Sequence, residues 1–420
     1  MQLSPLRTTL VATFTTVCLL FVAWILLKPD DTLLSDANFE YEVISPNADN
    51  IYDVTKVTYT LEQPANVSIF FLDNDGKRYD FRRNKPRQSG EHNLLFSGIV
   101  NGFSKSSDSV EGTIVSRILP NDEYQWVIEA NNQQASERKT GSLTIQLADD
   151  TLPDMRGFSV SPILFTPNRD GISDRIWINL FLTKEAHVDV YMIDNNENHL
   201  PIAERAGNTP IDQPGMHTFE YEGGVDLGVS PPPDGTYKVI ANSLDAIGQK
   251  VSVEGQLEIK HGGVPRADIV NANVEFADTT IVQGNEIMFA LTVENYGTSP
   301  IRTSGPEPGF QYTQNENSNT HGWYEESGAW RIGIDCDTCI RDYPWRWSLG
   351  KKHELTKIGE YWYLMPGERA TITGAITITD VPARNPLYFW AGLIHEDVEI
   401  SNVNNRVAVS YTHLTLPTKA

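Results

Sequence analysis

The most reactive residues of the chain form a single C-x-x-C pair, Cys336 and Cys339. Such a pair can act as a redox dithiol, supply two ligands to zinc, or close a structural disulfide. Redox chemistry needs a lowered thiol pKa, and the aspartates on both sides of Cys336 oppose thiolate formation. Zinc needs two more ligands, and neither His321 nor His353 lies at ligand spacing. We favour a disulfide that closes a tight loop in an oxidising compartment, with free thiols as the remaining alternative.

Asn- and Asp-rich loops are candidates for calcium, the only cofactor that the sequence suggests. Asn168, Asp170 and Asp174 form one such group, and residues 47–53 hold the same residue types at the same spacing. Calcium takes oxygen ligands from clustered carboxylates and carbonyls. The spacing is not that of an EF-hand, and Asn and Asp are also common turn formers. Calcium binding and simple turns are therefore both open hypotheses.

Tryptophan is concentrated in the last third of the chain, which holds six of the nine. Trp345 and Trp347 alternate with one arginine, which places both indoles on one face of a strand. Exposed aromatic rings stack on sugars and favour protein interfaces, whereas inward rings fill a core. The candidate surface for a glycan or protein partner consists of Trp323, Trp330, Trp345, Trp347 and Trp362, with an aromatic core as the alternative.

Catalytic motifs are missing from the sequence, which has no H-E-x-x-H, G-x-S-x-G, Walker A or dinucleotide glycine pattern. The matches to S-x-x-K at 348–351 and to K-T-G at 139–141 stand in the wrong order. We therefore expect no enzyme. The net charge of −22 argues against a nucleic-acid partner, because phosphate contacts need clustered cations. It also disfavours an anionic lipid surface as partner of the part outside the membrane.

An apolar segment lies near the N-terminus, ahead of the predicted β-domains. Residues 9–27 contain no charge and reach roughly 28 Å as a helix, close to the hydrocarbon thickness of a bilayer. Arg7 precedes the segment and Lys28 follows it, a weak bias that places the N-terminus in the cytoplasm. A cleaved signal peptide is the alternative, but its apolar region is usually shorter. We predict a cytoplasmic stub and single-pass anchor over 1–30, with the bulk of the chain outside the cytoplasm.

Short alternating apolar runs follow, separated by Gly, Pro, Asn and Asp, as in 67–71, 124–128 and 176–181. Such regular short strands predict β-sandwiches. A repeat at a shift of 121 residues relates Pro46-Asn47-Ala48-Asp49 to Pro167-Asn168-Arg169-Asp170. The predicted fold is all-β: an N-terminal transmembrane helix followed by three tandem Ig-like β-sandwich domains. Their expected limits are 37–148, 155–260 and 266–408.

The second repeat resembles the Ig-like domain of the flagellar hook-capping protein FlgD. The resemblance rests on residues 167–171 (Pro-Asn-Arg-Asp-Gly), on the strand 186–190 (Ala-His-Val-Asp-Val), and on 233–237 (Pro-Asp-Gly-Thr-Tyr). The family's Trp-Asp-Gly turn is Tyr-Glu-Gly here, at 221–223. The first repeat is a more degenerate copy. The resemblance implies a fold and leaves the function open.

The third domain is similar to CARDB, the bacterial cell-adhesion-related sandwich. The similarity rests on 282–297, with its Gln-Gly and Asn-Tyr-Gly turns, and on 365–368 (Met-Pro-Gly-Glu). An aromatic-rich segment, about 303–363, is expected as an insertion. Residues 409–420 resemble translated sequencing-adapter DNA, so we expect a non-native tail there.

Together these features suggest a membrane-anchored extracytoplasmic structural or adhesion protein that presents its β-sandwich domains to a protein or surface partner. The alternative is a carbohydrate-binding or cell-wall-associated module that uses the aromatic cluster of the third domain. An enzyme with a site in 303–363 ranks last.

Overall fold

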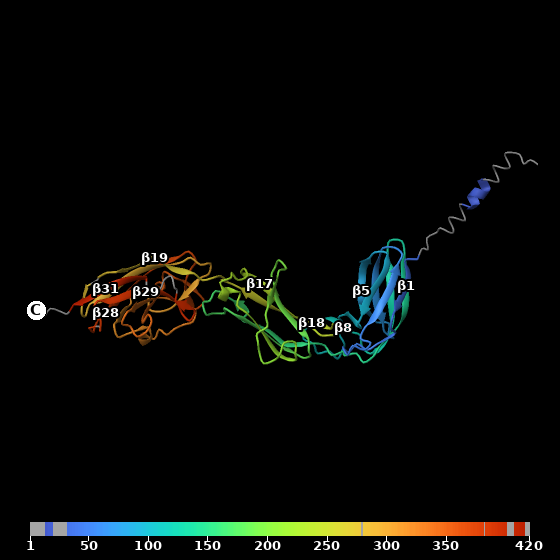
Figure 1. The fold of residues 1–420 in the computed structure, drawn as a ribbon, viewed down its shortest axis with the longest axis horizontal. Coiled ribbons are helices and arrows are strands. Elements are labelled where there is room, and N and C mark those ends of the chain that lie inside the picture. The colour runs from blue at the N-terminus through green and yellow to red at the C-terminus, as the bar shows by residue number, and fades with distance from the viewer. Residues whose placement is uncertain (1–12, 20–31, 279, 382, 401–406, 416–420) are drawn as a thin grey trace, which may run out of the picture.

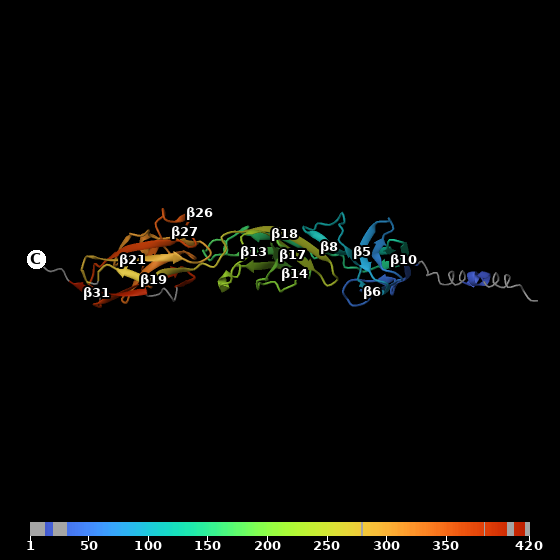
Figure 2. The ribbon, with the colours of Figure 1, turned by 90° about the horizontal axis from the view of Figure 1, so that it is seen from above.

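The computed structural model describes residues 13–19, 32–278, 280–381, 383–400 and 407–415. Residues 13–19 are helical, and within these ranges no helix is both long and apolar enough to span a bilayer. Most of the predicted transmembrane segment, 9–27, lies outside the described residues. From residue 34 onward the chain folds into packed β-sheets, which confirms the all-β expectation. Three units follow one another along one long axis (Figures 1 and 2).

The first domain contains β1 (Leu34–Phe39), β2 (Val43–Ile44), β3 (Thr55–Leu61), β4 (Ala65–Leu72), β5 (Arg78–Arg87), β6 (Gly90–Phe96), β9 (Asp122–Asn131) and β10 (Ser136–Ile145). Strand β1 begins before residue 37, where the sequence placed the domain boundary. One sheet has the order β1-β3-β6 and the other the order β2-β10-β9-β4-β5. Buried side chains alternate with outward ones along β3, and the two sheets enclose one hydrophobic core.

The second domain contains β11 (Met155–Ser161), β12 (Leu164–Phe165), β13 (Ile176–Leu182), β14 (His187–Ile193), β15 (His199–Ile202), β16 (Gly215–Tyr221), the 3-10 helix η1 (Val225–Leu227), β17 (Gly235–Leu244) and β18 (Lys250–Ile259). Its sheets have the orders β11-β13-β16 and β12-β18-β17-β14-β15. Each strand occupies the position of its counterpart in the first domain, and β12 pairs in parallel with β18 as β2 does with β10.

A hairpin crosses from the first domain to the second. It consists of β7 (Ile99–Asn101) and β8 (Thr113–Ile118), which lie between β6 and β9 in the chain. Strand β8 pairs antiparallel with β18, with Ile114 opposite Val251, and so extends the second domain's sheet (Figure 1). Backbone hydrogen bonds therefore connect the two domains, in addition to the covalent linker.

The third domain contains β19 (Ala267–Phe276), β20 (Thr280–Val282), β21 (Glu286–Asn295), β22 (Ile301–Thr303), β23 (Gln311–Thr313), the 3-10 helix η2 (Ser318–His321), β24 (Trp330–Cys336), β25 (Trp345–Ser348), β26 (Thr356–Ile358), β27 (Tyr361–Leu364), β28 (Arg369–Thr377), β29 (Leu387–His395), β30 (Glu399–Ile400) and β31 (Val407–Thr415). One sheet has the order β19-β21-β28-β23. The other has the order β20-β31-β29-β24-β22-β27-β26, with β25 beside β24 and β30 beside β29.

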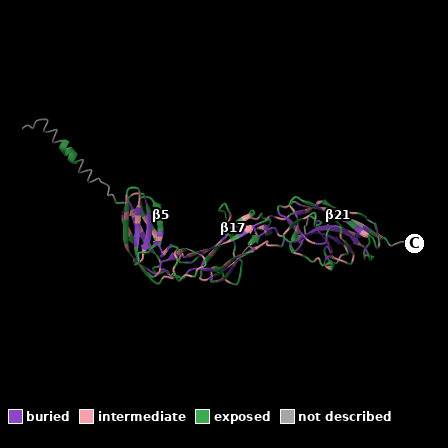
Figure 3. Cartoon of the chain, turned by 180° about the vertical axis from the view of Figure 1, so that it is seen from behind, coloured by how far each residue is buried: buried purple, intermediate pink, exposed green. Residues whose placement is uncertain are grey.

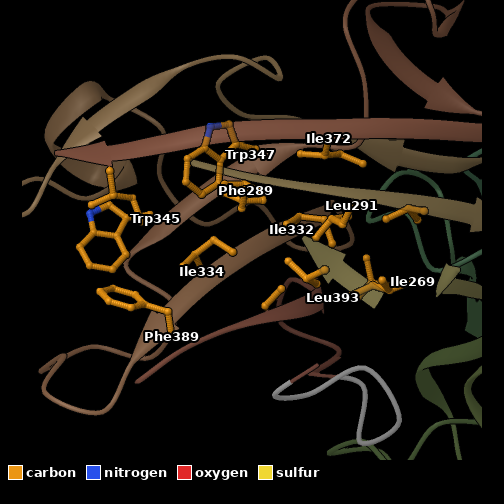
Figure 4. Close-up of a cluster of buried hydrophobic side chains, with 14 of the residues drawn as sticks. Ile269, Phe289, Leu291, Ile332, Ile334, Trp345, Trp347, Ile372, Phe389 and Leu393 are labelled. Carbon is orange, nitrogen blue, oxygen red and sulfur yellow. The ribbon is translucent and has the colours of Figure 1, made fainter. Parts of the chain in front are cut away.

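The aromatic-rich segment 303–363 is an integral part of this sandwich. It supplies β24, which lies in the middle of the larger sheet, and every residue of β24 is buried. Figure 4 shows its side chains Ile332 and Ile334 among those of the smaller sheet. The segment expected as an insertion therefore contributes to the sandwich itself, because without β24 the sheet would lose the strand that joins β29 to β22.

Strand β31 reaches into the predicted non-native tail. Its backbone pairs with β29 and, in parallel, with β20. The ladder hydrogen bonds of a strand come from backbone groups, so alternating residues of any origin can occupy this position. Residues 416–420 lie outside the described part.

Candidate functional site

Three of the five tryptophans predicted for a ligand surface lie inside the third domain. Trp330, Trp345 and Trp347 are 5%, 2% and 0% exposed. The indole N–H of Trp347 donates to the carbonyl oxygen of Phe310 (3.0 Å), so its one polar group is satisfied without solvent. In Figure 4 Trp347 lies beside Phe289 and Trp345 beside Phe389. The prediction of a binding surface is thus corrected for these three residues, which form core.

The other two tryptophans line an open groove on the third domain. Trp323 and Trp362 are half-buried, and they border a cavity of 220 Å³ together with Tyr361, which is 40% exposed. The groove walls also contain the carboxylates of Glu307, Glu326 and Glu360 and the ammonium group of Lys352. This mixture of aromatic faces and a few polar groups is typical of a ligand pocket.

Rigid elements hold the groove open. Its floor includes Thr303 at the end of β22, whose hydroxyl donates to the carbonyl oxygen of Trp330 (2.7 Å) and accepts from the N–H of Leu349 (2.8 Å). Tyr361 and Trp362 project from the β26–β27 hairpin, whose turn has Gly359 at φ 61°. The guanidinium carbon of Arg302 lies 5.2 Å from the ring centre of Tyr361, a cation–π distance. A hairpin therefore holds Tyr361 and Trp362, whereas Trp323 lies in the loop that follows η2.

Cys336 and Cys339 form a disulfide at the end of β24, with their Cα atoms 5.1 Å apart. The bridge closes a turn in which the N–H of Cys339 donates to the carbonyl oxygen of Cys336 (3.1 Å). Both histidines that we considered as zinc ligands lie elsewhere: His321 packs on Phe310 and Tyr312, and His353 contacts Glu354. The pair therefore forms a structural disulfide in this fold.

The Asn168 loop uses its oxygens for hydrogen bonds within the protein. Both carboxylate oxygens of Asp174 accept backbone N–H groups: Oδ1 those of Asn168 and Arg169, and Oδ2 that of Gly171 (2.6 Å). The side-chain oxygen of Asn168 accepts the N–H of Asp170 (3.0 Å). In the described part of the chain, no group of three or more His, Cys, Asp or Glu residues is arranged to hold a metal. The structure shows a hydrogen-bonded loop here, and the calcium hypothesis stays a prediction.

This loop is the point at which the second domain docks onto the third. Tyr363 donates its hydroxyl to Oδ2 of Asp170 (2.9 Å), and Arg302 donates from Nε to the carbonyl oxygen of the same residue (2.7 Å). His395 Nε2 donates to the carbonyl oxygen of Arg169 (2.8 Å). Asp170, Arg302 and His395 are each at most 5% exposed. We call this contact the second joint.

Two glycines permit the close approach at the second joint. A Cβ atom on Gly171 would lie 2.1 Å from the carbonyl oxygen of Ser327, and one on Gly328 would lie 2.1 Å from the carbonyl carbon of Asp170. Real Cβ contacts at these distances do not occur, so each position requires a residue without a side chain. Both also have positive φ, 81° and 79°, which glycine adopts most easily.

The joint contains two groups with shifted pKa values. Burial, with the nearby charge of Asp174, raises the pKa of Asp170 to about 6 against the opposing effect of Tyr363 and Arg302. Burial lowers the pKa of His395 to about 4, so its ring is neutral at pH 7 and stacks on Trp330 at 4.3 Å. The contact therefore contains an ionised carboxylate and a neutral imidazole at neutral pH.

A buried ionic cluster lies behind the joint. Arg346 contacts both carboxylate oxygens of Glu396 through Nη1 (2.8 Å each), and Arg331 Nη1 lies 3.3 Å from Oε1 of the same residue. Arg331 is 0% exposed. Removing Glu396 would leave the fully buried guanidinium of Arg331 without its nearest carboxylate, which is strongly destabilising. Glu396 precedes the turn to β30 and follows His395, so the cluster also fixes the histidine of the joint.

The first domain carries the same loop in a different setting. Oδ1 of Asp53 accepts the N–H groups of Asn47 and Ala48, and its Oδ2 accepts that of Asn50, the pattern that Asp174 shows 121 residues later. Positive φ recurs at the equivalent positions as well, including 66° at Asn50. Here the loop is exposed and borders a cleft of 620 Å³ between the first two domains. The position of Gly171 is occupied by asparagine, which is exposed.

The contact between the first and second domains, which we call the first joint, is therefore held by other residues. Gln249, which is 0% exposed, donates its amide to the linker carbonyl oxygens of Asp149 (3.1 Å) and Thr151 (2.9 Å). The ammonium group of Lys184 lies 2.8 Å from the carboxylates of both Asp149 and Asp245. These contacts bind the linker 149–154 to the second domain, and the β8–β18 ladder adds backbone pairing between the two domains.

Comparisons with known proteins add little to this geometry. No protein-family model and no curated protein matches the chain. Among solved structures, a mutant of Salmonella alpha-2-macroglobulin is similar at 10% identity and a TM-score of 0.21, over 91% of this chain and 23% of that one. A 1.5-MDa bacterial ice-binding adhesin gives 11% and 0.20, over 92% and 98%. Dimeric latent PorU from Porphyromonas gingivalis gives 8% and 0.20, over 92% and 34%. We draw no conclusion from TM-scores this low.

Sequence reasoning missed the residues that complete the second joint. Arg302, Tyr363 and His395 are 132, 193 and 226 positions away from the loop residues that they contact. Their types gave no signal, because a lone Arg, Tyr or His is common at any surface. The one available hint was the difference between Asp170-Gly171 and Asp49-Asn50 in otherwise matching loops.

Proposed function

We propose that this protein is a membrane-anchored extracytoplasmic spacer that holds its third domain at a fixed position and presents the aromatic groove to a partner. The observation that carries the proposal is the construction of the two joints. Domains strung on free linkers change their relative orientation. Here buried polar contacts connect the neighbouring domains at both joints.

The second joint supports a fixed orientation most directly. Its contacts are short, buried and come from three separate elements of the third domain, β22, β27 and β29. A change of angle between the domains would break all three contacts and expose the carboxylate of Asp170. The buried charge gives the contact a single favourable geometry, because a partly satisfied polar network costs more than none.

The anchor and the location belong to the same proposal. The uncharged run 9–27 has the length and composition of a membrane span, and the disulfide between Cys336 and Cys339 suits an oxidising compartment. The partner would be a protein or a cell-surface polymer that reaches the third domain. The two FlgD-like repeats then serve as spacing elements.

Pairs of spin labels on the full chain test the spacer. With Cys18→Ser as background, Asp75→Cys with Asn208→Cys spans the first joint, and Asn196→Cys with His353→Cys spans the second. All four positions are exposed. We expect one narrow distance distribution for each pair by pulsed electron spin resonance. Broad distributions for both pairs would contradict a fixed spacer.

Carbohydrate binding is a second candidate, and the groove favours it. Trp323, Trp362 and Tyr361 keep exposed faces around one cavity whose polar groups include three carboxylates, a combination that suits stacking on a sugar ring with hydrogen bonds to its hydroxyls. Titration of the full chain with cell-wall and matrix polysaccharides, followed by tryptophan fluorescence, tests this reading. Saturable binding that Trp323→Ala and Trp362→Ala both abolish supports it. Indifference to every polysaccharide leaves a protein partner.

A further inference from the structure

A basic segment interrupts the acidic surface of the first domain. Residues 77–87 contain six of the chain's 33 Lys and Arg residues and one carboxylate, in a protein whose net charge is −22. They form β5 and the residue before it. The net charge of the whole chain therefore gives no guide to the electrostatics at this edge.

The outer half of β5 exposes four of these cations, Arg82, Arg83, Lys85 and Arg87, which we call the basic ridge. Within the described part of the chain, only Arg83 lies within 4.0 Å of a carboxylate: Asp80, at 3.6 Å, with 72% of the arginine side chain exposed. Arg82 contacts the carbonyl oxygen and ring of Phe81, and Arg87 the carbonyl oxygen of Pro86. The ridge charges are thus available to an external anion.

Two backbone features present the ridge outward. Strand β5 is the edge strand of its sheet and pairs with β4 alone. The pairing shifts register beside Ile69, and Asn84 has a φ of 49°. Such a bulge twists an edge strand away from the regular ladder. As a result every residue from Arg82 to Arg87 is exposed, whereas Tyr79 and Phe81 still point into the core.

The ridge lies at the end of the first domain where the chain enters it. Arg87 is paired with Ala65 at the start of β4, and Leu34 at the start of β1 is paired with Leu61 at the end of β3, only a short turn away. Seven Cα steps separate Leu34 from Leu27, the last residue of the apolar run, a span of at most about 25 Å.

We propose that the basic ridge docks the first domain onto the anionic phospholipid headgroups of the membrane that holds the anchor. Lys and Arg side chains within a Debye length of such a surface are attracted to it, and several act together. The inference rests on the proposed anchor at 9–27. Its consequence is that the three-domain rod has a defined tilt at its base as well as rigid joints along its length.

Fluorescence quenching in vesicles tests the ridge in the full chain. A fluorophore on Ser89→Cys, in the Cys18→Ser background, lies next to the ridge in an exposed turn. Vesicles of phosphatidylcholine, with or without about one third phosphatidylglycerol, carry a nitroxide on a trace lipid headgroup. We expect strong quenching on anionic vesicles, weak quenching on neutral ones, and loss of the difference when salt rises from about 0.1 M to about 0.5 M.

A charge-reversed pair provides the decisive comparison. Arg82→Glu with Lys85→Glu should lower the anionic-dependent quenching at least about tenfold. Arg205→Glu with Lys238→Glu changes the net charge equally on the second domain, where both side chains are more than 60% exposed, and should leave the quenching unchanged. Equal loss in both variants, or equal quenching on neutral and anionic vesicles, would overturn the proposal.

Flotation of the same samples separates the ridge from the anchor. Flotation with neutral vesicles at high salt supports the anchor whatever the ridge does. Flotation only with anionic vesicles, reversed by salt and by the ridge variant, would reject the anchor and keep the ridge. A chain that floats with neither composition would reject both. Unquenched label on anionic vesicles, with ridge-dependent binding of a soluble anionic polysaccharide, would overturn the lipid assignment.

Discussion

Tyr363 donates its hydroxyl to Oδ2 of Asp170 across 2.9 Å, and this bond joins the third domain to the second. The tyrosine belongs to β27, the same strand that carries Tyr361 and Trp362 into the aromatic groove. The joint and the groove therefore share one hairpin. Whatever fixes the position of the second domain on β27 also fixes the orientation of the groove walls.

Removal of this hydroxyl should weaken the third domain. Tyr363→Phe leaves a buried, mostly ionised carboxylate short of one donor, and hydrogen bonds to charged groups contribute about 1.5–3 kcal/mol. We expect the free energy of unfolding, followed by tryptophan fluorescence, to fall by about that amount. Tyr324→Phe is the control, since Tyr324 is 65% exposed. Equal stability of the two variants would show that the bond contributes nothing.

A methyl group at Gly171 should open the second joint. Gly171→Ala places a Cβ 2.1 Å from Ser327, whereas Gly76→Ala, at nearly the same φ (78° against 81°), meets no atom within 4 Å. Both variants carry the cost of a left-handed alanine, about 1–2 kcal/mol. Only Gly171→Ala should broaden the spin-label distances across the second joint. Unchanged distances in that variant would refute the close-packed joint.

The pH dependence of stability should reveal the raised pKa of Asp170. Its pKa of about 6 lies above the ordinary 3.8, so the folded state binds the extra proton, and this carboxyl adds stability as pH falls from about 7 to 4. Asp170→Asn removes this contribution. The unfolding free energy of the native protein minus that of the variant should therefore rise on acidification, by about 1 kcal/mol per pH unit. A difference independent of pH would mean that Asp170 titrates normally.

His395 should have the opposite effect on the pH dependence of stability. Its pKa of about 4 lies below the ordinary 6.5, so the unfolded state takes up the proton first and stability falls as pH drops from about 7 to 4. His395→Gln should remove that loss, because glutamine can donate to the carbonyl oxygen of Arg169 without titrating. Denaturant titrations at several pH values check the slope. A slope that persists in the variant would assign it to other groups.

The core tryptophans should behave unlike the groove tryptophans. Trp347→Ala empties a fully buried site between the sheets and should lower stability by about 3–5 kcal/mol. Trp323→Ala and Trp362→Ala remove half-exposed rings and should cost far less, about 1 kcal/mol or below. Thermal unfolding of the three variants provides the measurement. Similar losses in all three would place the groove residues in the core.

The strands could be predicted from the sequence because alternation is a local property. Trp345 and Trp347 were placed on one face of a strand, and they do share a face in β25. Which face points inward depends on β28 and β21, whose residues lie elsewhere in the chain. Periodicity therefore identified the pair and could not decide between core and ligand surface.

The Asn168 loop shows the same limit of sequence-based prediction at a candidate binding site. Its residue types pointed to clustered oxygens, and the oxygens are clustered. Their partners are backbone N–H groups of the loop together with Tyr363. The same oxygen-bearing residue types can either accept N–H groups or bind a cation. Only the folded geometry shows which of the two occupies the lone pairs.

The asparagine at position 50 and the glycine at position 171 have a consequence for how such a chain could be rearranged. Placed directly before the third domain, the first domain would bring the side chain of Asn50 to the position where only glycine clears Ser327. The two sandwiches have the same strand order and are nevertheless not interchangeable. An added copy of the first domain could lengthen this rod ahead of the existing first domain, because the exposed loop at the first joint tolerates asparagine. An unmodified copy could not be inserted directly ahead of the third domain.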